Sequence, residues 1–199
     1  DERRQLFAII EQQNQELKTL NDQLESKVQL RTEQVRLSLQ KIDNAHNALK
    51  KQFNNTIKTF ARIIEMRPGI KSGHSKYIAE NAKELAQRLN MADDDVKDIL
   101  YAGLLLQIGK ISLPDDLLRQ PLTGMTLAGR KRFLHHGQEG SNLLSGIDQL
   151  KNAAELILYQ HENFDGSGEP HGLSGSQIPL GSRILAVVRD YISSLDGFI

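Results

Sequence analysis

Residues 17–53 read LKTLNDQLESKVQLRTEQVRLSLQKIDNAHNALKKQF, and this stretch decides how the first third of the chain folds. Apolar side chains recur at seven-residue steps with a second set interleaved. This seam consists of Ile10, Leu17, Leu20, Leu24, Val28, Val35, Leu39, Ile42, Leu49 and Phe53. A seven-residue repeat is typical of a coiled coil. Because residues 1–67 contain no glycine and no proline, we predict one continuous helix over them.

So narrow an apolar stripe cannot stabilise a long helix alone, and a parallel homodimer is the simplest source of a partner helix. The step from Leu24 to Val28 is four residues where the repeat expects three, which predicts a slip of register near the middle of the coil. His46 falls on the seam, and we interpret it as a polar residue that sets the register rather than as a pH sensor.

Pro68-Gly69 ends this helix and begins a second domain, which we assign to residues 68–199. The sequence predicts helices at about 74–90, 95–108, 126–136, 148–162 and 183–195, with a glycine-rich loop from Asp165 to Gly181. Asp93 or Asp94 is expected to cap the second of these helices, and Thr126 the third. Because no alternating strand pattern of useful length occurs, the predicted fold class is all-α, a long coiled-coil helix followed by a helical bundle.

Composition excludes several classes of partner and site. The 25 basic and 25 acidic side chains balance, and the pI is near 7.2, which argues against binding to nucleic acid or to an anionic membrane. The absence of cysteine excludes disulfides and thiolate metal sites. No apolar run approaches the roughly 20 residues of a membrane span and no signal peptide is visible, so we expect a soluble, cytoplasmic protein.

Histidines recur at the ends of the predicted helices of the second domain, at His74, His135-His136 and His161. The last is followed by Glu162 and by the glycine-rich loop. A lone histidine is more often structural or solvated than a ligand, but this group together suggests a pocket.

The second domain resembles the HD-GYP phosphodiesterases, a branch of the HD phosphohydrolase superfamily, over about residues 60–195. The matching segments, in order, are Gly73-His74-Ser75, AGLLLQIGKISLPD at 102–115, His136 with Gly140, QHENFDGSGEP at 160–170, Gly172-Leu173, Ile178-Pro179 and Arg183-Ile184-Leu185. The resemblance implies a helical bundle, and in the family this bundle holds two or three metal ions that cleave the bacterial second messenger cyclic di-GMP.

The departures from the family pattern are concentrated at its metal-ligand positions. The family's His-Asp pair is Leu106-Gln107 here, its paired histidines are Gln160-His161, and a ligand Asp after the Arg-Ile-Leu segment is Arg189. These substitutions predict that no catalytic residue set remains, since leucine ligates nothing and a permanent cation repels a metal. Asp190 is a poor substitute for the missing ligand Asp, because on a helix it would point about 100° away from Arg189. Arg189 itself could pair with Glu162 or Glu169.

The family's tripeptide reads Gly168-Glu169-Pro170. The retained family residues are His74, Lys110, His136, His161, Glu162, Asp165, Gly166, Gly168, Pro170 and Arg183. His74, His136 and His161 are the residual metal-ligand candidates, and they would hold at most one divalent ion such as iron, manganese or zinc, although we expect no cofactor. The ligand-binding candidates are Lys110, Arg183, Arg189, Gly168 and Pro170.

Three functions stay open on this basis. The first is an inactive output module of bacterial two-component and cyclic di-GMP signalling, which acts as a regulator or as an interaction surface for a signalling protein partner. The second is a weak or altered phosphodiesterase with a reduced metal site, and the third is a metal-free sensor of cyclic di-GMP. Residues 24–35, LESKVQLRTEQV, also resemble the linkers that follow receiver domains of response regulators, which implies an upstream receiver. In the family more helix follows the segment near Leu195, which predicts a continuation beyond Ile199.

Overall fold

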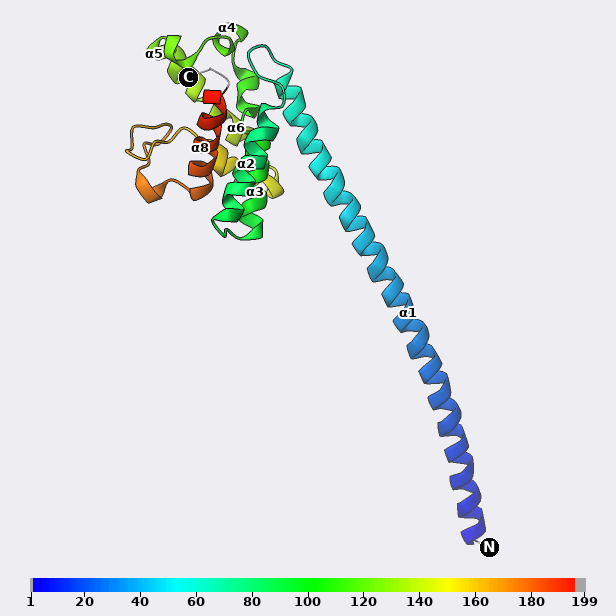
Figure 1. Cartoon of the computed structure of the whole chain (residues 1–199). Helices are drawn as coiled ribbons and strands as arrows, with labels where there is room; N and C mark the ends of the chain where they lie inside the picture. The colour runs from blue at the N-terminus through cyan, green and yellow to red at the C-terminus, as the bar shows by residue number, and fades with distance from the viewer. Residues whose placement is uncertain (1, 196–199) are drawn as a thin grey trace. The chain divides into compact units, whose positions relative to one another are not determined.

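The computed structural model describes residues 2–195, and in this part of the chain it is all-α, as the sequence predicts. Figure 1 shows the course of the chain. The α-helices are α1 (Glu2–Glu65), α2 (His74–Arg88), α3 (Asp93–Leu105), α4 (Asp115–Leu118), α5 (Leu127–Leu134), α6 (His136–Leu144), α7 (Lys151–Leu158) and α8 (Leu180–Leu195). The 3-10 helices are η1 (Ile108–Ser112), η2 (Leu122–Gly124), η3 (Asp148–Leu150) and η4 (Gly175–Gln177).

The chain divides into two compact units between Phe53 and Asn54. The first unit consists of α1 up to Phe53. The predicted seam residues in it are largely open to solvent, with Leu17 63%, Leu24 57% and Leu49 67% exposed. A row of exposed leucines on a helix is unusual for a chain that works alone, because each carries apolar surface that water disfavours.

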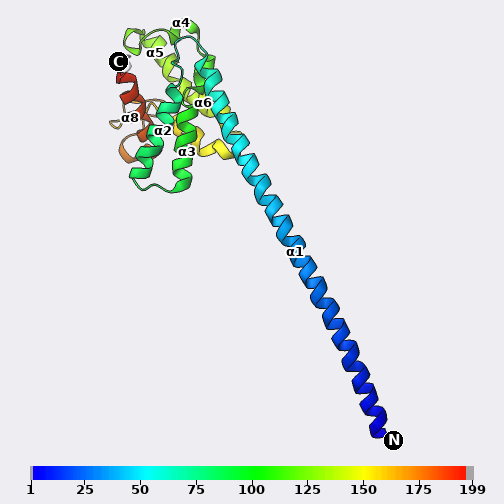
Figure 2. The same cartoon turned by 45° about the vertical axis from the view of Figure 1, so that its right-hand side comes forward.

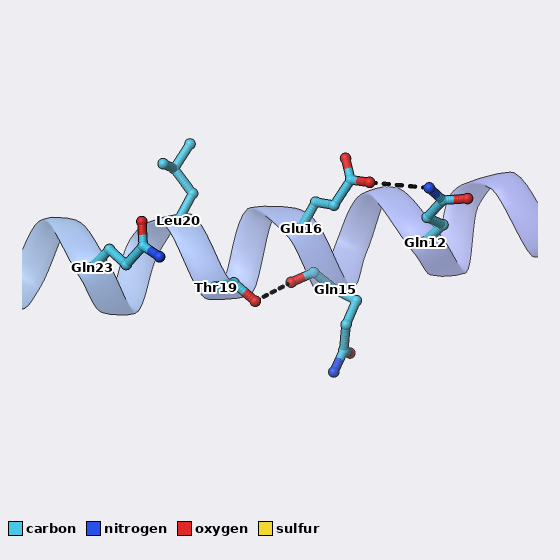
Figure 3. A pocket seen from close by; sticks show the side chains of 6 residues that line it. All are labelled: Gln12, Gln15, Glu16, Thr19, Leu20 and Gln23. Atoms are coloured by element: carbon cyan, nitrogen blue, oxygen red, sulfur yellow. Dashed lines mark hydrogen bonds between the residues drawn. The ribbon is translucent and has the colours of Figure 1, made fainter.

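A shallow hollow along this part of α1 is lined by side chains of one helix only, which Figure 3 shows from close by. The lining residues are Gln12, Gln15, Glu16, Thr19, Leu20 and Gln23. Gln12 donates to Glu16 over 3.0 Å and Thr19 donates to the Gln15 carbonyl over 2.9 Å, so these polar groups bond within the helix. Since no second element closes the hollow, it is the open surface beside the seam residue Leu20 and not a ligand pocket.

The second unit is a helical bundle that includes the last three turns of α1. Within it α2 packs against α3 and α8, and α6 packs against η1 and α7. Figure 2 shows α2 beside α3 from a second side. Gly103 of α3 lies against the backbone of Ala79, where a Cβ would collide, so α2 and α3 approach each other closely. The core residues include Ile57, Ala61, Ile64, Ile78, Ala82, Ile99, Leu105, Leu150, Ile157, Ile184 and Leu185.

Several predicted helix bounds are wrong at their ends. Neither Asp93 nor Asp94 caps α3, because the helix begins at Asp93 and Ala92 takes the cap position; the acids lie in the first turn, where the helix dipole favours negative charge. Thr126 does cap α5, and its hydroxyl accepts from the Gly129 amide.

The helix predicted at 126–136 corresponds to α5, which ends at Leu134, and α6, which follows from His136 to Leu144, was missed altogether. Gly140 of α6 sits in close packing, where an added Cβ would lie 3.1 Å from Ile108 and 3.2 Å from Ile157. The helix predicted at 148–162 is shorter, since η3 precedes α7 and α7 ends at Leu158. α3 likewise ends at Leu105, before the 3-10 helix η1 begins.

No helix among residues 2–195 is both long enough and apolar enough to cross a membrane.

Candidate functional site

Two of the three predicted histidine ligands come together between α6 and the end of α7. His136 opens α6 and is buried, with 2% of its surface exposed, and His161 follows α7 and is partly buried. Their rings meet edge to face with centroids 4.8 Å apart, and the two Nε2 atoms lie 3.5 Å from each other. His74 opens α2. No group of three or more His, Asp or Glu side chains in the described part of the chain is placed to hold a metal ion.

Arg189 of α8 reaches the same place. Its NH1 group lies 3.2 Å from Nδ1 of His161 and donates to the Gln160 carbonyl over 2.7 Å. Its Nε group pairs with the neighbouring Asp190 over 2.9 Å. The side chain of Arg189 is 21% exposed and that of Asp190 63%, so Arg189 points inward and Asp190 outward. The alternative partners Glu162 and Glu169 are therefore not the ones that Arg189 uses.

The hydrogen bonds assign the protons on the two imidazoles. His136 Nδ1 lies 2.6 Å from the carbonyl oxygen of Phe133, which only accepts, so His136 carries its proton on Nδ1. Arg189 only donates, so His161 Nδ1 is the acceptor and its proton lies on Nε2. The Nε2 proton of His161 then faces the Nε2 lone pair of His136 across the 3.5 Å contact.

This chain of contacts, from Arg189 through both imidazoles to Phe133, leaves neither the lone pair of His136 nor that of His161 free. The lone pair of His161 accepts from Arg189, and the lone pair of His136 faces a proton. A metal ligand must offer such a lone pair. His136 and His161, as they are bonded in this structure, therefore do not fit the metal ions that the family resemblance implies.

The charges around His136 and His161 also disfavour a bound metal ion. Burial, followed by the charge of Lys110, lowers the pKa of His136 to about 3. Burial and then the charge of Arg189 lower the pKa of His161 well below its usual value. Burial, together with Arg189, lowers the pKa of Lys110 to about 8. Both histidines are thus neutral at pH 7, and the local charge is positive.

The sequence predicts that Leu106, Gln107 and Gln160 stand at ligand positions of the family pattern. Leu106 is buried, at 2% exposure, and Gln107 is buried with its Oε1 atom lacking a hydrogen-bond partner within residues 2–195. Gln160 is 1% exposed and donates to the carbonyls of Leu106 and Ile157 over 3.3 and 3.1 Å. These residues pack the interior and contribute no carboxylate.

Glu162 matches the family pattern, but its carboxylate is hydrogen-bonded to the glycine-rich loop. Its two carboxylate oxygens accept from the amides of His171 and Leu173 over 2.7 and 2.9 Å, and the residue is 6% exposed. Gly168 lies against the backbone of Glu162 and Asn163, where any side chain would collide. Gly168 therefore shapes this loop, and neighbouring Pro170 is exposed on it. Arg183 of α8 is partly buried, and its Nε atom has no partner among the described residues.

Lys110 lies on η1, with its Nζ 4.8 Å from the ring centre of Phe133. That ring also meets His136 edge to face at 5.3 Å. Phe133 belongs with Met125 to a small apolar cluster around Leu113, Leu117 and Leu118, which fixes it beside the site. Sequence reasoning missed Phe133, since a single aromatic residue in a predicted helix gives no sign of this contact.

Sequence reasoning also missed the two residues that join the end of α1 to the site region. Arg67 donates to the carbonyls of Lys110, Ile111 and Leu113 at 2.9, 2.6 and 2.8 Å and pairs with Asp115. Glu65 accepts from the amides of Gly73 and Ser75 at 2.7 and 2.8 Å, on either side of His74. The end of α1 is therefore bonded directly to η1 and to the start of α2.

Residues 58–195 match the model of a family described as HD domain, so the chain belongs to the HD domain family. Its relatives include the cyclic di-GMP phosphodiesterase response regulator RpfG of Xanthomonas campestris pv. campestris (strain 8004), with 36% identity over 145 residues, or 71% of this chain and 38% of that protein. The cyclic di-GMP phosphodiesterase PA4108 of Pseudomonas aeruginosa is 36% identical over 126 residues, or 61% of this chain and 30% of that protein.

A third relative, the 3'3'-cGAMP-specific phosphodiesterase 2 of Vibrio cholerae serotype O1, is 28% identical over 141 residues, or 70% of this chain and 27% of that protein. The names of these relatives support the resemblance to the HD-GYP branch. The chain spans between about a quarter and two fifths of the length of the curated relatives it matches.

Proposed function

We propose that this chain is the output part of a bacterial signalling protein, with an HD domain that does not hydrolyse cyclic nucleotides and acts as a regulator or interaction surface. The observation that carries the proposal is the position of Arg189. Its guanidinium donates hydrogen bonds to His161 Nδ1 and to the Gln160 carbonyl. By the family resemblance, this position would carry an acidic ligand.

Hydrolysis of a phosphodiester by clustered metals needs one cation to generate hydroxide and others to take up phosphoryl charge. Carboxylates normally hold such cations together. Here the nearby acid, Glu162, is bonded to two loop amides, and the cations Lys110 and Arg189 stand beside the histidines. A divalent ion would have to displace Arg189 and then lie next to Lys110, which electrostatic repulsion opposes.

The regulatory part of the proposal rests on α1. Its exposed seam favours a parallel homodimer, because full burial of each of these side chains contributes on the order of 1.5–3 kcal/mol before entropy is counted. Arg67 and Glu65 offer a direct route from the end of α1 to η1 and α2. An upstream receiver domain would fit this arrangement, and one relative is itself named a response regulator.

A metal-free sensor of cyclic di-GMP is the second candidate, and the observation that favours it is the unpaired charge of Lys110. Within residues 2–195 no carboxylate pairs with Lys110, and Arg189 and burial lower its pKa to about 8. A phosphate would relieve this repulsion. The sensor candidate is weakened by Arg189, because its guanidinium is already bonded to the Gln160 carbonyl and to His161 Nδ1. A reduced-metal phosphodiesterase has less support, since the two imidazole lone pairs are engaged.

Two measurements on the purified chain test the proposal. Incubation with manganese or iron and cyclic di-GMP should give no linear product above buffer, and elemental analysis should find no bound transition metal. Calorimetry with cyclic di-GMP, with and without EDTA, separates the remaining candidates: weak, salt-sensitive binding that EDTA leaves unchanged favours the sensor. Steady turnover would overturn the proposal, as would tight binding that EDTA abolishes.

A further inference from the structure

The seven-residue spacing of the seam continues past Phe53 into the second unit. Phe60 follows Phe53 by seven residues, and Ile63 follows Leu49 by fourteen. Both belong to the last turns of α1, and both are open to solvent, with Phe60 44% and Ile63 50% exposed. Phe60 and Ile63 are therefore exposed apolar side chains on the surface of the bundle, and both fall on seam positions of the seven-residue repeat.

The same turns of α1 carry a different apolar face for the core of the bundle. Ile57, Ala61 and Ile64 are 2%, 5% and 3% exposed. Successive residues of an α-helix point about 100° apart, so Ile63 faces away from the direction in which Ile64 is buried. The core thus uses one face of α1 and leaves the seam face uncovered.

The repeat also has a definite end. The next seam position after Ile63 is Arg67, but its guanidinium is bonded to the carbonyls of Lys110, Ile111 and Leu113. From Val35 to Ile63, by contrast, the positions of the repeat hold no side chain with a permanent charge. They are Val35, Leu39, Ile42, His46, Leu49, Phe53, Thr56, Phe60 and Ile63.

We infer that the homodimer interface extends along α1 to Ile63, so that Phe60 and Ile63 of one copy pack against Phe60 and Ile63 of a second copy. This inference rests on the homodimer proposed above. A second copy is the occupant because a parallel two-fold coil places every seam residue opposite its own counterpart, and an apolar residue then meets an apolar partner of the same spacing.

The extended interface would place the dimer contact on the helix turns that also form the domain core. Ile64 is buried next to Ile63, and Glu65 and Arg67 follow with their bonds to α2 and η1. A change in how the two copies pack at Phe60 and Ile63 would therefore reach the segments that carry His74 and Lys110 without passing through a flexible linker.

Single cysteines in the full chain test this, because the natural sequence has none. Ile63→Cys probes the extension, Arg62→Cys is the matched control on the neighbouring and exposed helix position, and Leu49→Cys reports on the coil itself. Under mild oxidation Ile63→Cys and Leu49→Cys should form interchain disulfides, and Arg62→Cys should do so at least roughly tenfold more slowly, because cysteines far apart cannot be bridged.

The crosslinking results distinguish the extension of the interface to Ile63 from the coil dimer itself. If Leu49→Cys crosslinks while Ile63→Cys is as slow as Arg62→Cys, the extension is wrong and the coil dimer stands. If neither Leu49→Cys nor Ile63→Cys crosslinks, the parallel dimer itself fails and the extension with it. As a second readout, Ile63→Asp should weaken dimerisation in sedimentation equilibrium more than Arg62→Asp does, and equal effects would also overturn the inference.

Discussion

The buried histidine pair predicts that mild acid destabilises the domain. Burial holds the pKa of His136 at about 3, while in the unfolded chain it returns to roughly 6.5. Below pH 6.5 the unfolded chain therefore binds a proton that the native chain does not, and the free energy of unfolding falls as the pH falls. At about pH 5 the loss from His136 is roughly 1.5 units at ~1.36 kcal/mol each, or about 2 kcal/mol.

This loss is measured by urea unfolding at about pH 5 and pH 7.5, for the natural chain and for His136→Gln. Glutamine does not titrate, so the variant should lose about 2 kcal/mol less than the natural chain over this interval. His135→Gln is the control, because that neighbouring side chain is 57% exposed. If His136→Gln and the natural chain lose the same free energy, burial does not lower the pKa of native His136 and the reasoning is wrong.

Three further predictions concern residues of the second unit. Arg67→Ala should lower the free energy of unfolding by about 2 kcal/mol in urea titrations, since it removes bonds to three carbonyls and Asp115, whereas Arg62→Ala should change it by less than about 0.5 kcal/mol. Gly109→Ala should destabilise the domain by about 3 kcal/mol or prevent folding, because its Cβ would overlap the His136 carbonyl; Gly146→Ala, with open space around it, is the thermal-melt control. The combined variant Leu106→His, Gln107→Asp, Gln160→His and Arg189→Asp should gain bound manganese or iron in elemental analysis, and the same variant with Arg189 kept should gain much less; equal metal content in the two would remove Arg189 from the argument.

The general architecture of the chain was readable from the sequence alone. The absence of glycine and proline over residues 1–67 and the seven-residue repeat are local properties, and they predict α1 with nearly correct ends. Pro68-Gly69 and the Thr126 cap likewise determine only the local backbone, at the end of α1 and at the start of α5. The ordered motifs from His74 to Arg183 indicated the HD domain family for the same reason, since each motif keeps its residues and spacing in the linear chain.

Other features depend on residues that meet only in the folded bundle. The sequence analysis missed α6, because nothing in the sequence shows that Gly109 and Gly140 allow η1 and α6 to approach each other. The sequence predicts Arg189 at a ligand position, but its partners His161 and Gln160 lie 28 and 29 residues away along the chain. Arg67 bonds residues 43 to 48 positions further on, for which no local pattern exists. The sequence thus predicts which positions depart from the family pattern, and the tertiary structure decides which groups those side chains contact, because hydrogen-bond partners are chosen by distance in space.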